Sequence, residues 1–285
     1  MTQAKHSTPG HLYIVPTPIG NLEDITLRAL RILKEVDLIA AEDTRHSKRL
    51  LNHFAISTPL ISYYREKEIQ RAAELVERLL SGTTVALISD AGTPGISDPG
   101  AVLVREARAA GIEITPLPGP SALTTALSAA GFTDTSFLFL GFLPSKASQR
   151  RKLLTSLINA AQPIIFYESP HRMTDLLHDI HAIMGDRKIF WARELTKIHE
   201  ELQTGTPAEL LAHCTTGRVR GESVLIVDAG AQQPAEGENL HELLIWYRDQ
   251  GELSLKDTSR RIAQDLGLSR SEVYQQALAV WKEDT

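Results

Sequence analysis

A segment rich in glycine and proline stands at Asp90-Ala91-Gly92-Thr93-Pro94-Gly95-Ile96-Ser97-Asp98-Pro99-Gly100. An apolar run at 85–89 precedes this segment and an amphipathic run at 101–110 follows it, so the segment joins a strand to a helix. Its glycines allow backbone to approach a ligand closely, and its prolines stiffen the path of the chain. Because α/β sheets bind ligands at the carboxyl ends of their strands, we expect this loop to line a binding site.

Two further strand ends carry loops of the same kind. Pro16-Thr17-Pro18-Ile19-Gly20-Asn21 follows the expected strand at 12–15, and Pro116-Leu117-Pro118-Gly119-Pro120-Ser121-Ala122 follows the expected strand at 112–116. The second of these places Ser121 near the start of a helix, where backbone N–H groups lack intrahelical partners. Three rigid loops at successive strand ends predict one shared ligand site.

The loops do not match the common phosphate-binding patterns. Neither G-x-x-x-x-G-K-[ST] nor the dinucleotide pattern G-x-G-x-x-G occurs in them, so ATP and NAD are poor candidates. Loops rich in glycine and poor in charge suit a ligand with an adenosine portion and a zwitterionic tail, which backbone groups would hold.

Around these loops, short apolar runs alternate with amphipathic stretches, which predicts an α/β fold with mostly parallel sheets. We expect an α/β domain at 1–120 that carries the cofactor loops and a second α/β domain at 121–230 that completes the cleft. Residues 231–285 read as a polar linker followed by a helical tail. In that tail Ala263, Gly267 and Val273 have helix-turn-helix spacing, although a helical hairpin that packs on the body or on a partner subunit fits equally.

Composition limits the possible functions. The net charge is −5, which argues against a protein that coats nucleic acid nonspecifically but does not exclude RNA as a substrate. The absence of a long apolar run predicts a cytoplasmic protein. The single cysteine, Cys214, excludes an internal disulfide, and His171 and His199 have no spaced partners, so we assign no metal.

Charged side chains gather at three other expected strand ends. These segments are Glu42-Asp43-Thr44-Arg45, Glu168-Ser169-Pro170-His171-Arg172 and Arg193-Glu194-Leu195-Thr196-Lys197. Because buried charges are costly unless they are paired, such groups either line a cleft or form ion pairs across it. The sequence leaves both possibilities open.

Six ordered motifs between residues 12 and 227 resemble the RNA-modifying branch of the tetrapyrrole methylase superfamily. They are Leu12–Leu22, Ala41–Arg45, Ser89–Pro94, Pro116–Ala122, Phe166–Ser169 and Ala192–Lys197. The resemblance implies a class III methyltransferase of two α/β domains with a helical C-terminal extension. It further implies that S-adenosyl-L-methionine binds in the cleft between the domains and that the protein is a homodimer.

The resemblance also assigns residues to the cofactor. Its cofactor contacts carry over to Ile19, Thr93, Pro94, Ile96, Ser121, Ala122 and Tyr167. Most tetrapyrrole methylases have Gly-Asp-Pro in the second loop, where this chain has Gly92-Thr93-Pro94. That difference is typical of the RNA-modifying branch.

The implied reaction is 2′-O-methylation of the ribose of a decoding-centre cytidine in 16S rRNA, within the small ribosomal subunit. A carboxylate or a lysine must then take the proton of the ribose hydroxyl, and the candidates are Glu194, Asp43 and Lys197. The candidates for contacts with RNA are Arg45, Arg193, Arg150 and Arg151.

Two alternatives remain at this point. The first is an enzyme of the same fold that methylates a tetrapyrrole or another small substrate, since it would share every cofactor loop. The second is a non-catalytic nucleic-acid-binding protein that uses the helical tail, but it leaves three ligand-shaped loops in one domain unexplained.

Overall fold

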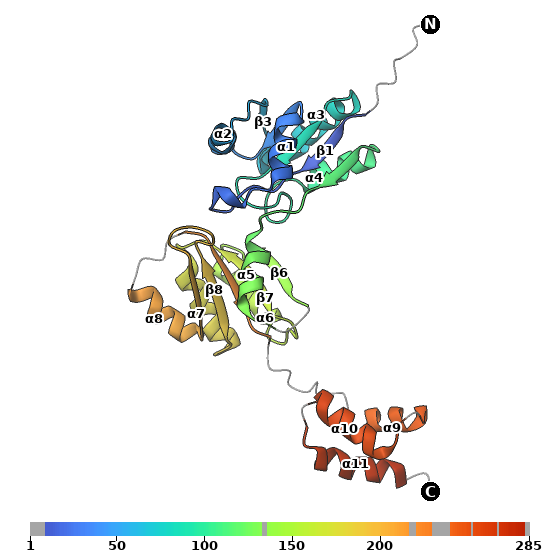
Figure 1. Cartoon of the computed structure of the whole chain (residues 1–285). Helices are drawn as coiled ribbons and strands as arrows, with labels where there is room; N and C mark the ends of the chain where they lie inside the picture. The colour runs from blue at the N-terminus through green and yellow to red at the C-terminus, as the bar shows by residue number, and fades with distance from the viewer. Residues whose placement is uncertain are drawn as a thin grey trace. The chain divides into compact units, whose positions relative to one another are not determined.

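The structure is a computed structural model that describes residues 9–132, 136–216, 221–229, 240–251, 253–266 and 268–282. The chain divides into two compact units, Met1–Ala229 and Gly230–Thr285 (Figure 1). The expected linker at 231–237 lies outside the described residues. Every helix in the described ranges is too short or too polar to cross a bilayer.

The first sheet of the larger unit is wholly parallel. Its strands are β1 (His11–Ile14), β2 (Leu38–Ala41), β3 (Leu60–Ser62), β4 (Val85–Ile88) and β5 (Glu113–Pro116), in the order β3-β2-β4-β1-β5. All of its pairings are parallel, so every strand ends at the same edge. Because β4, β1 and β5 are neighbours, the three loops rich in proline and glycine emerge side by side.

Helices cover both faces of this sheet. Helices α1 (Leu27–Glu35) and α2 (Thr44–His53) pack on one face, and α3 (Glu68–Leu80) and α4 (Ala101–Ala109) pack on the other. Successive residues of β4 face opposite sides of the sheet. Leu87 belongs to the core under α3 and α4, and Ala86 belongs to the core under α1 and α2. Short 3₁₀ turns at Leu22–Asp24 and Arg65–Lys67 precede α1 and α3.

The second sheet is mixed, which corrects the expectation of mostly parallel strands. Its strands are β6 (Leu138–Phe142), β7 (Ile164–Glu168), β8 (Ile189–Arg193), β9 (Glu201–Gly205) and β10 (Ser223–Val227), in the order β6-β7-β10-β8-β9. Among its described strands, only β6 and β7 pair in parallel. The segment 194–200 between β8 and β9 is too short for a parallel crossover, and β10 inserts between β7 and β8 in the opposite direction.

This sheet too is covered on both faces. Helix α5 (Ala122–Ala130) packs on one face through Leu123 and Ala126. The other face carries α6 (Ala147–Ser156), α7 (Met173–Met184) and α8 (Pro207–Thr216) around Phe166 and Trp191.

The smaller unit consists of α9 (Leu240–Gln250), α10 (Leu255–Leu266) and α11 (Arg270–Lys282). These helices bury Leu244, Ile262 and Val273 in a core of their own. The expected turn residue Gly267 lies outside the described residues. The described part of the tail is therefore a unit of three helices, and its contact with RNA or with a partner subunit stays a prediction.

Candidate active site

Hydrogen bonds tie the three strand-end loops of the first sheet to one another. Thr17 and Gly92 exchange both of their backbone N–H···O bonds, each 2.9 Å long. The Thr93 hydroxyl donates to the carbonyl of Pro120 at 3.0 Å. The loops after β1, β4 and β5 are therefore joined into one surface.

The second sheet presents an edge of its own to these loops. β7 and β8 end at this edge, and β10, which runs antiparallel to both, begins there. The edge carries Tyr167 from β7 and Ser223 from β10. The Tyr167 hydroxyl accepts a hydrogen bond from the backbone N–H of Leu123 at 3.1 Å, in the first turn of α5. Ser121 occupies the N-cap position of α5, but its side chain makes no capping bond.

Gly20 allows the first loop to pack against the loop after β8. A Cβ atom at this position would lie 2.5 Å from Cγ of Lys197 and 2.9 Å from the carbonyl oxygen of Leu195. The next residue, Asn21, donates its backbone N–H to the Thr196 hydroxyl at 3.0 Å. A side chain at position 20 would force these two loops apart.

The loop after β8 holds Glu194 in an unusual backbone conformation. Glu194 has φ +51° and Thr196 has φ +66°, a region that non-glycine residues rarely occupy. Glu194 Oε1 lies 2.7 Å from Nζ of Lys197. A Cβ atom on Gly221 would lie 1.7 Å from the same Oε1, so any other residue there would displace this carboxylate.

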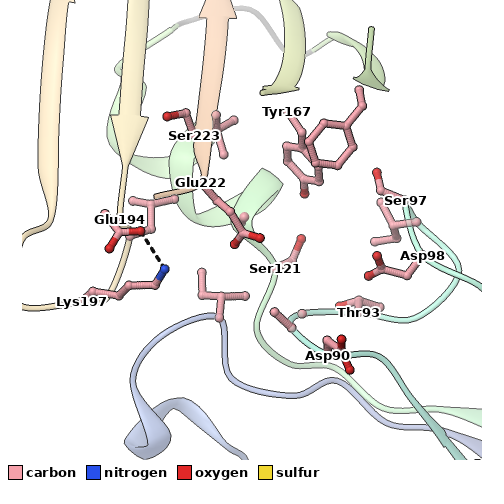
Figure 2. Close-up of a pocket in the computed structure, with 18 of the residues that line it drawn as sticks. Asp90, Thr93, Ser97, Asp98, Ser121, Tyr167, Glu194, Lys197, Glu222 and Ser223 are labelled. Carbon is pink, nitrogen blue, oxygen red and sulfur yellow. Dashed lines mark hydrogen bonds and ion pairs between the residues drawn. The ribbon is translucent and has the colours of Figure 1, made fainter. Parts of the chain in front are cut away.

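The loops and the sheet edge enclose a cavity of about 270 Å³, called here the cofactor cavity. Figure 2 shows the Glu194–Lys197 pair on one side and Asp98 on the other, with Glu222 and Ser121 between them. Its lining consists of Ile19, Glu42, Asp90, Ala91, Gly92, Thr93, Ile96, Ser97, Asp98, Ser121, Ala122, Phe142, Tyr167, Glu194, Leu195, Lys197, Glu222, Ser223 and Val224.

Carboxylates dominate the charge of this cavity. Burial, followed by the nearby negative charges of Asp98 and Asp90, raises the pKa of Glu42 to about 7. Burial also raises the pKa of Asp98, against the opposing effect of its hydrogen bond with Ser89. Together with Glu194 and Glu222, these groups give the cavity a negative potential that favours a cationic ligand.

Most of the residues expected to bind the cofactor line this cavity. Ile19, Thr93, Ile96, Ser121, Ala122 and Tyr167 are all in its lining. Pro94 is buried next to Thr93 but is not part of the lining. Glu194 and Lys197, two of the three expected catalytic residues, also line it.

Asp43, the third, has a different environment. It caps α2, where its carboxylate accepts from the backbone N–H groups of Arg45 and His46, and these bonds lower its pKa. The cavity lining does not include it. The expectation that Asp43 takes part in catalysis is therefore not supported by its position.

The arginines expected to contact RNA are dispersed, and most are engaged elsewhere. Arg150 is only 4% exposed and donates to Asp179 at 2.6 Å, which corrects its assignment to an RNA surface. Arg151 shares Asp179 at 2.7 Å, and Arg193 is bonded to Glu201. Arg45 is 92% exposed beside Asp43.

The sequence did not single out four of the five lining carboxylates as site residues. Glu42, Asp90 and Asp98 had a usable signal, since all three lie at the carboxyl end of the first sheet in or next to expected functional segments. Glu222 had none, because it reaches the cavity only through the insertion of β10 between β7 and β8.

A sequence profile of the family described as Tetrapyrrole (Corrin/Porphyrin) Methylases matches residues 11–211. The chain belongs to the tetrapyrrole methylase family. The matched region of this tetrapyrrole methylase begins at β1 and extends into α8, so it includes strands of both sheets.

Curated relatives of this tetrapyrrole methylase match almost its whole length. Ribosomal RNA small subunit methyltransferase I of Vibrio cholerae is 47% identical over 94% of this chain and 94% of its own. The protein of that name from Escherichia coli O157:H7 is 46% identical over 97% of both chains. The one from Bacillus subtilis is 41% identical over 94% of both.

Solved structures share the fold of this tetrapyrrole methylase at low identity. A diphthine synthase structure superposes with a TM-score of 0.61 at 15% identity, covering 77% of this chain and 90% of that one. A uroporphyrin-III-C-methyltransferase from Thermus thermophilus has a TM-score of 0.56 at 19% identity, covering 77% and 94%. These similarities establish the fold.

Methyltransferases of this family use S-adenosyl-L-methionine as methyl donor. The cofactor cavity fits that molecule in charge and in polarity. Its carboxylates complement the positive charges of the sulfonium and the ammonium group, and Ile19, Ala122 and Val224 offer apolar surface for the adenosine. The hydroxyls of Thr93, Ser121 and Tyr167 add polar groups.

Proposed function

We propose that this protein methylates the 2′-oxygen of the ribose of a decoding-centre cytidine in 16S rRNA. The observation that carries the proposal is its similarity to proteins named ribosomal RNA small subunit methyltransferase I, which reaches 47% identity over 94% of the chain. The relatives align along almost their whole length, so the similarity includes the loops of the cofactor cavity.

When bound, S-adenosyl-L-methionine supplies a methyl group on a positively charged sulfur. The work left to the chain is to orient the ribose hydroxyl and to accept its proton. Glu194 is suited to accept it, because it lines the cavity and the Lys197 ammonium, 2.7 Å away, fixes its position. We assign the proton to the Glu194 carboxylate and a positioning role to Lys197.

The proposal extends to partners and location. We infer that the target is RNA within the small ribosomal subunit, that the enzyme works in the cytoplasm and that it forms a homodimer. Support for a dimer comes from exposed apolar side chains around one surface hollow, namely Ile96, Leu140 and Phe142, which are 44%, 36% and 53% exposed. Light scattering would measure the oligomeric state.

A transfer assay tests the proposal against its rival of the same fold. The protein is incubated with methyl-labelled S-adenosyl-L-methionine and with small ribosomal subunits from cells that lack this modification, and in parallel with porphyrinoids. We expect label in the RNA and none in the porphyrinoids. Label in the porphyrinoids alone would reject an RNA substrate, whereas cofactor binding without transfer to RNA would reopen the choice of substrate.

A further inference from the structure

A second cavity adjoins the cofactor cavity, and its volume is about 760 Å³. The two cavities share the lining residues Ile19, Asp90, Ala91, Lys197 and Glu222. The second one, called here the α2 cavity, extends from this shared wall to helix α2. A molecule in the α2 cavity would therefore lie next to a ligand in the cofactor cavity.

Helix α2 lines its cavity with nitrogen-bearing side chains. His46, Arg49 and His53 follow at i, i+3 and i+7, so they share one face of the helix, and all three are exposed. In the part of the chain that the structure describes, the Arg49 guanidinium has neither an ion pair nor a hydrogen bond. Its donors are free to bind an anion.

Ser47 gives an independent indication of a ligand. It lines the same cavity and is only 2% exposed, yet its Oγ has no hydrogen-bond partner within the described residues. Leaving a buried polar group unpaired destabilises the protein, because the group loses its hydrogen bonds to water. A bound molecule with hydrogen-bonding groups in this cavity would offset that cost.

The two cavities differ in charge. Among the described residues, the cofactor cavity places five carboxylates against the single ammonium of Lys197, which would repel a phosphate. The described lining of the α2 cavity has only the two shared carboxylates, Asp90 and Glu222, and it adds Arg49 and two imidazoles. An RNA that places one uncharged ribose next to the cofactor cavity would therefore have its phosphates in the α2 cavity.

Building on the proposed function, we propose that the α2 cavity binds the RNA nucleotides next to the acceptor ribose. Arg49 contacts a backbone phosphate, and His46 and His53 stack on or donate to an unstacked base. The ribose then reaches the wall shared with the cofactor cavity, where Lys197 lies. This assignment replaces the dispersed arginines that the sequence indicated.

Steady-state kinetics with unmethylated small ribosomal subunits test the assignment. Arg49→Ala should raise KM for the subunits roughly tenfold or more, because a charge-assisted contact to a phosphate is lost. The value of kcat at saturating subunits and the cofactor Kd should stay within twofold of wild type. Arg49→Lys should recover part of the loss, since it keeps the charge but not the planar fork.

Lys48→Ala is the matched control, because Lys48 is an exposed cation of the same helix outside the lining of the α2 cavity. It should leave KM unchanged. Cofactor binding by each variant shows that the fold is intact. The assignment would be overturned if KM for the subunits stayed within twofold of wild type both in Arg49→Ala and in the double variant His46→Ala/His53→Ala. The proposed function would still stand. Absence of transfer by the wild-type enzyme would remove both.

Discussion

Glu42 makes the charge of the cofactor cavity dependent on pH. Its pKa lies at about 7, so the carboxylate is mostly charged at pH 8 and mostly neutral at pH 6. A cationic cofactor favours the charged form, so its affinity should rise with pH across this window, by up to about tenfold.

Isothermal titration calorimetry from pH 6 to pH 8 measures this effect. Glu42→Gln removes the titrating group, so its Kd for S-adenosyl-L-methionine should vary much less over the same window. If the variant keeps the full pH dependence of the wild-type protein, the effect does not come from Glu42.

A substitution at Glu194 should slow methyl transfer far more than it weakens cofactor binding. Glu194→Gln keeps the shape of the side chain but removes the proton acceptor, so kcat for methyl transfer should fall by about 100-fold or more. The cofactor Kd should change far less. Single-turnover assays with saturating cofactor measure this step.

Asp43→Asn is the comparison for that prediction. Asparagine also caps helices, so the variant should keep α2 and most of the activity. If Asp43→Asn lost most of its turnover while Glu194→Gln stayed active, Asp43 rather than Glu194 would be the proton acceptor.

At the scale of elements, the close contact at Gly20 holds the two walls of the cofactor cavity together. Gly20→Ala places a methyl group 2.5 Å from Cγ of Lys197, so the loops must separate and the cofactor Kd should rise by roughly tenfold. Gly111→Ala is the control, because its Cβ would meet nothing within 4 Å and only its φ of +74° is unfavourable.

That control should cost about 1 kcal/mol of stability and leave the cofactor Kd unchanged. Urea unfolding measures the stability of both variants, and calorimetry measures the binding. Equal cofactor affinity in Gly20→Ala and the wild-type protein would show that the contact does not shape the cavity.

The same scale shows what the sequence could predict. The buried strand β4 and the loop after it have clear patterns, and the cavity was expected where that loop lies. The edge strand β9, Glu201–Gly205, has one apolar side chain and was missed. Helix α2 was not predicted, because only two of its side chains, Leu50 and Leu51, are apolar.

Contacts between segments that are far apart in the chain could not be predicted from the sequence. Arg150 was a candidate for contact with RNA, yet it pairs with Asp179 on α7. Glu222 reaches the cavity only because β10 runs between β7 and β8. Neither arrangement leaves a periodic or local signal in the chain.

At the scale of the whole molecule, the tail should be separable from cofactor binding. The unit Gly230–Thr285 has its own core, and all lining residues of the cofactor cavity lie in the larger unit. A chain that ends at Ala229 should therefore bind S-adenosyl-L-methionine with a Kd within twofold of the full chain, as calorimetry would show.

Two further measurements on that shortened chain separate the roles of the tail. Loss of RNA binding with an intact dimer would assign the tail to RNA, and loss of the dimer would assign it to the partner subunit. If cofactor binding is lost although the larger unit remains folded, the cavity depends on the tail and the division into independent units is wrong.

The central claim concerns the atom that receives the methyl group. Alkaline hydrolysis of RNA requires a free 2′-hydroxyl, so a 2′-O-methyl group protects the adjoining phosphodiester bond. After transfer of labelled methyl groups to small ribosomal subunits, the purified 16S rRNA is hydrolysed in alkali and the products are separated. We predict label in an alkali-stable dinucleotide whose first residue is a decoding-centre cytidine. Label in mononucleotides, which would place the methyl group on a base, would contradict the account.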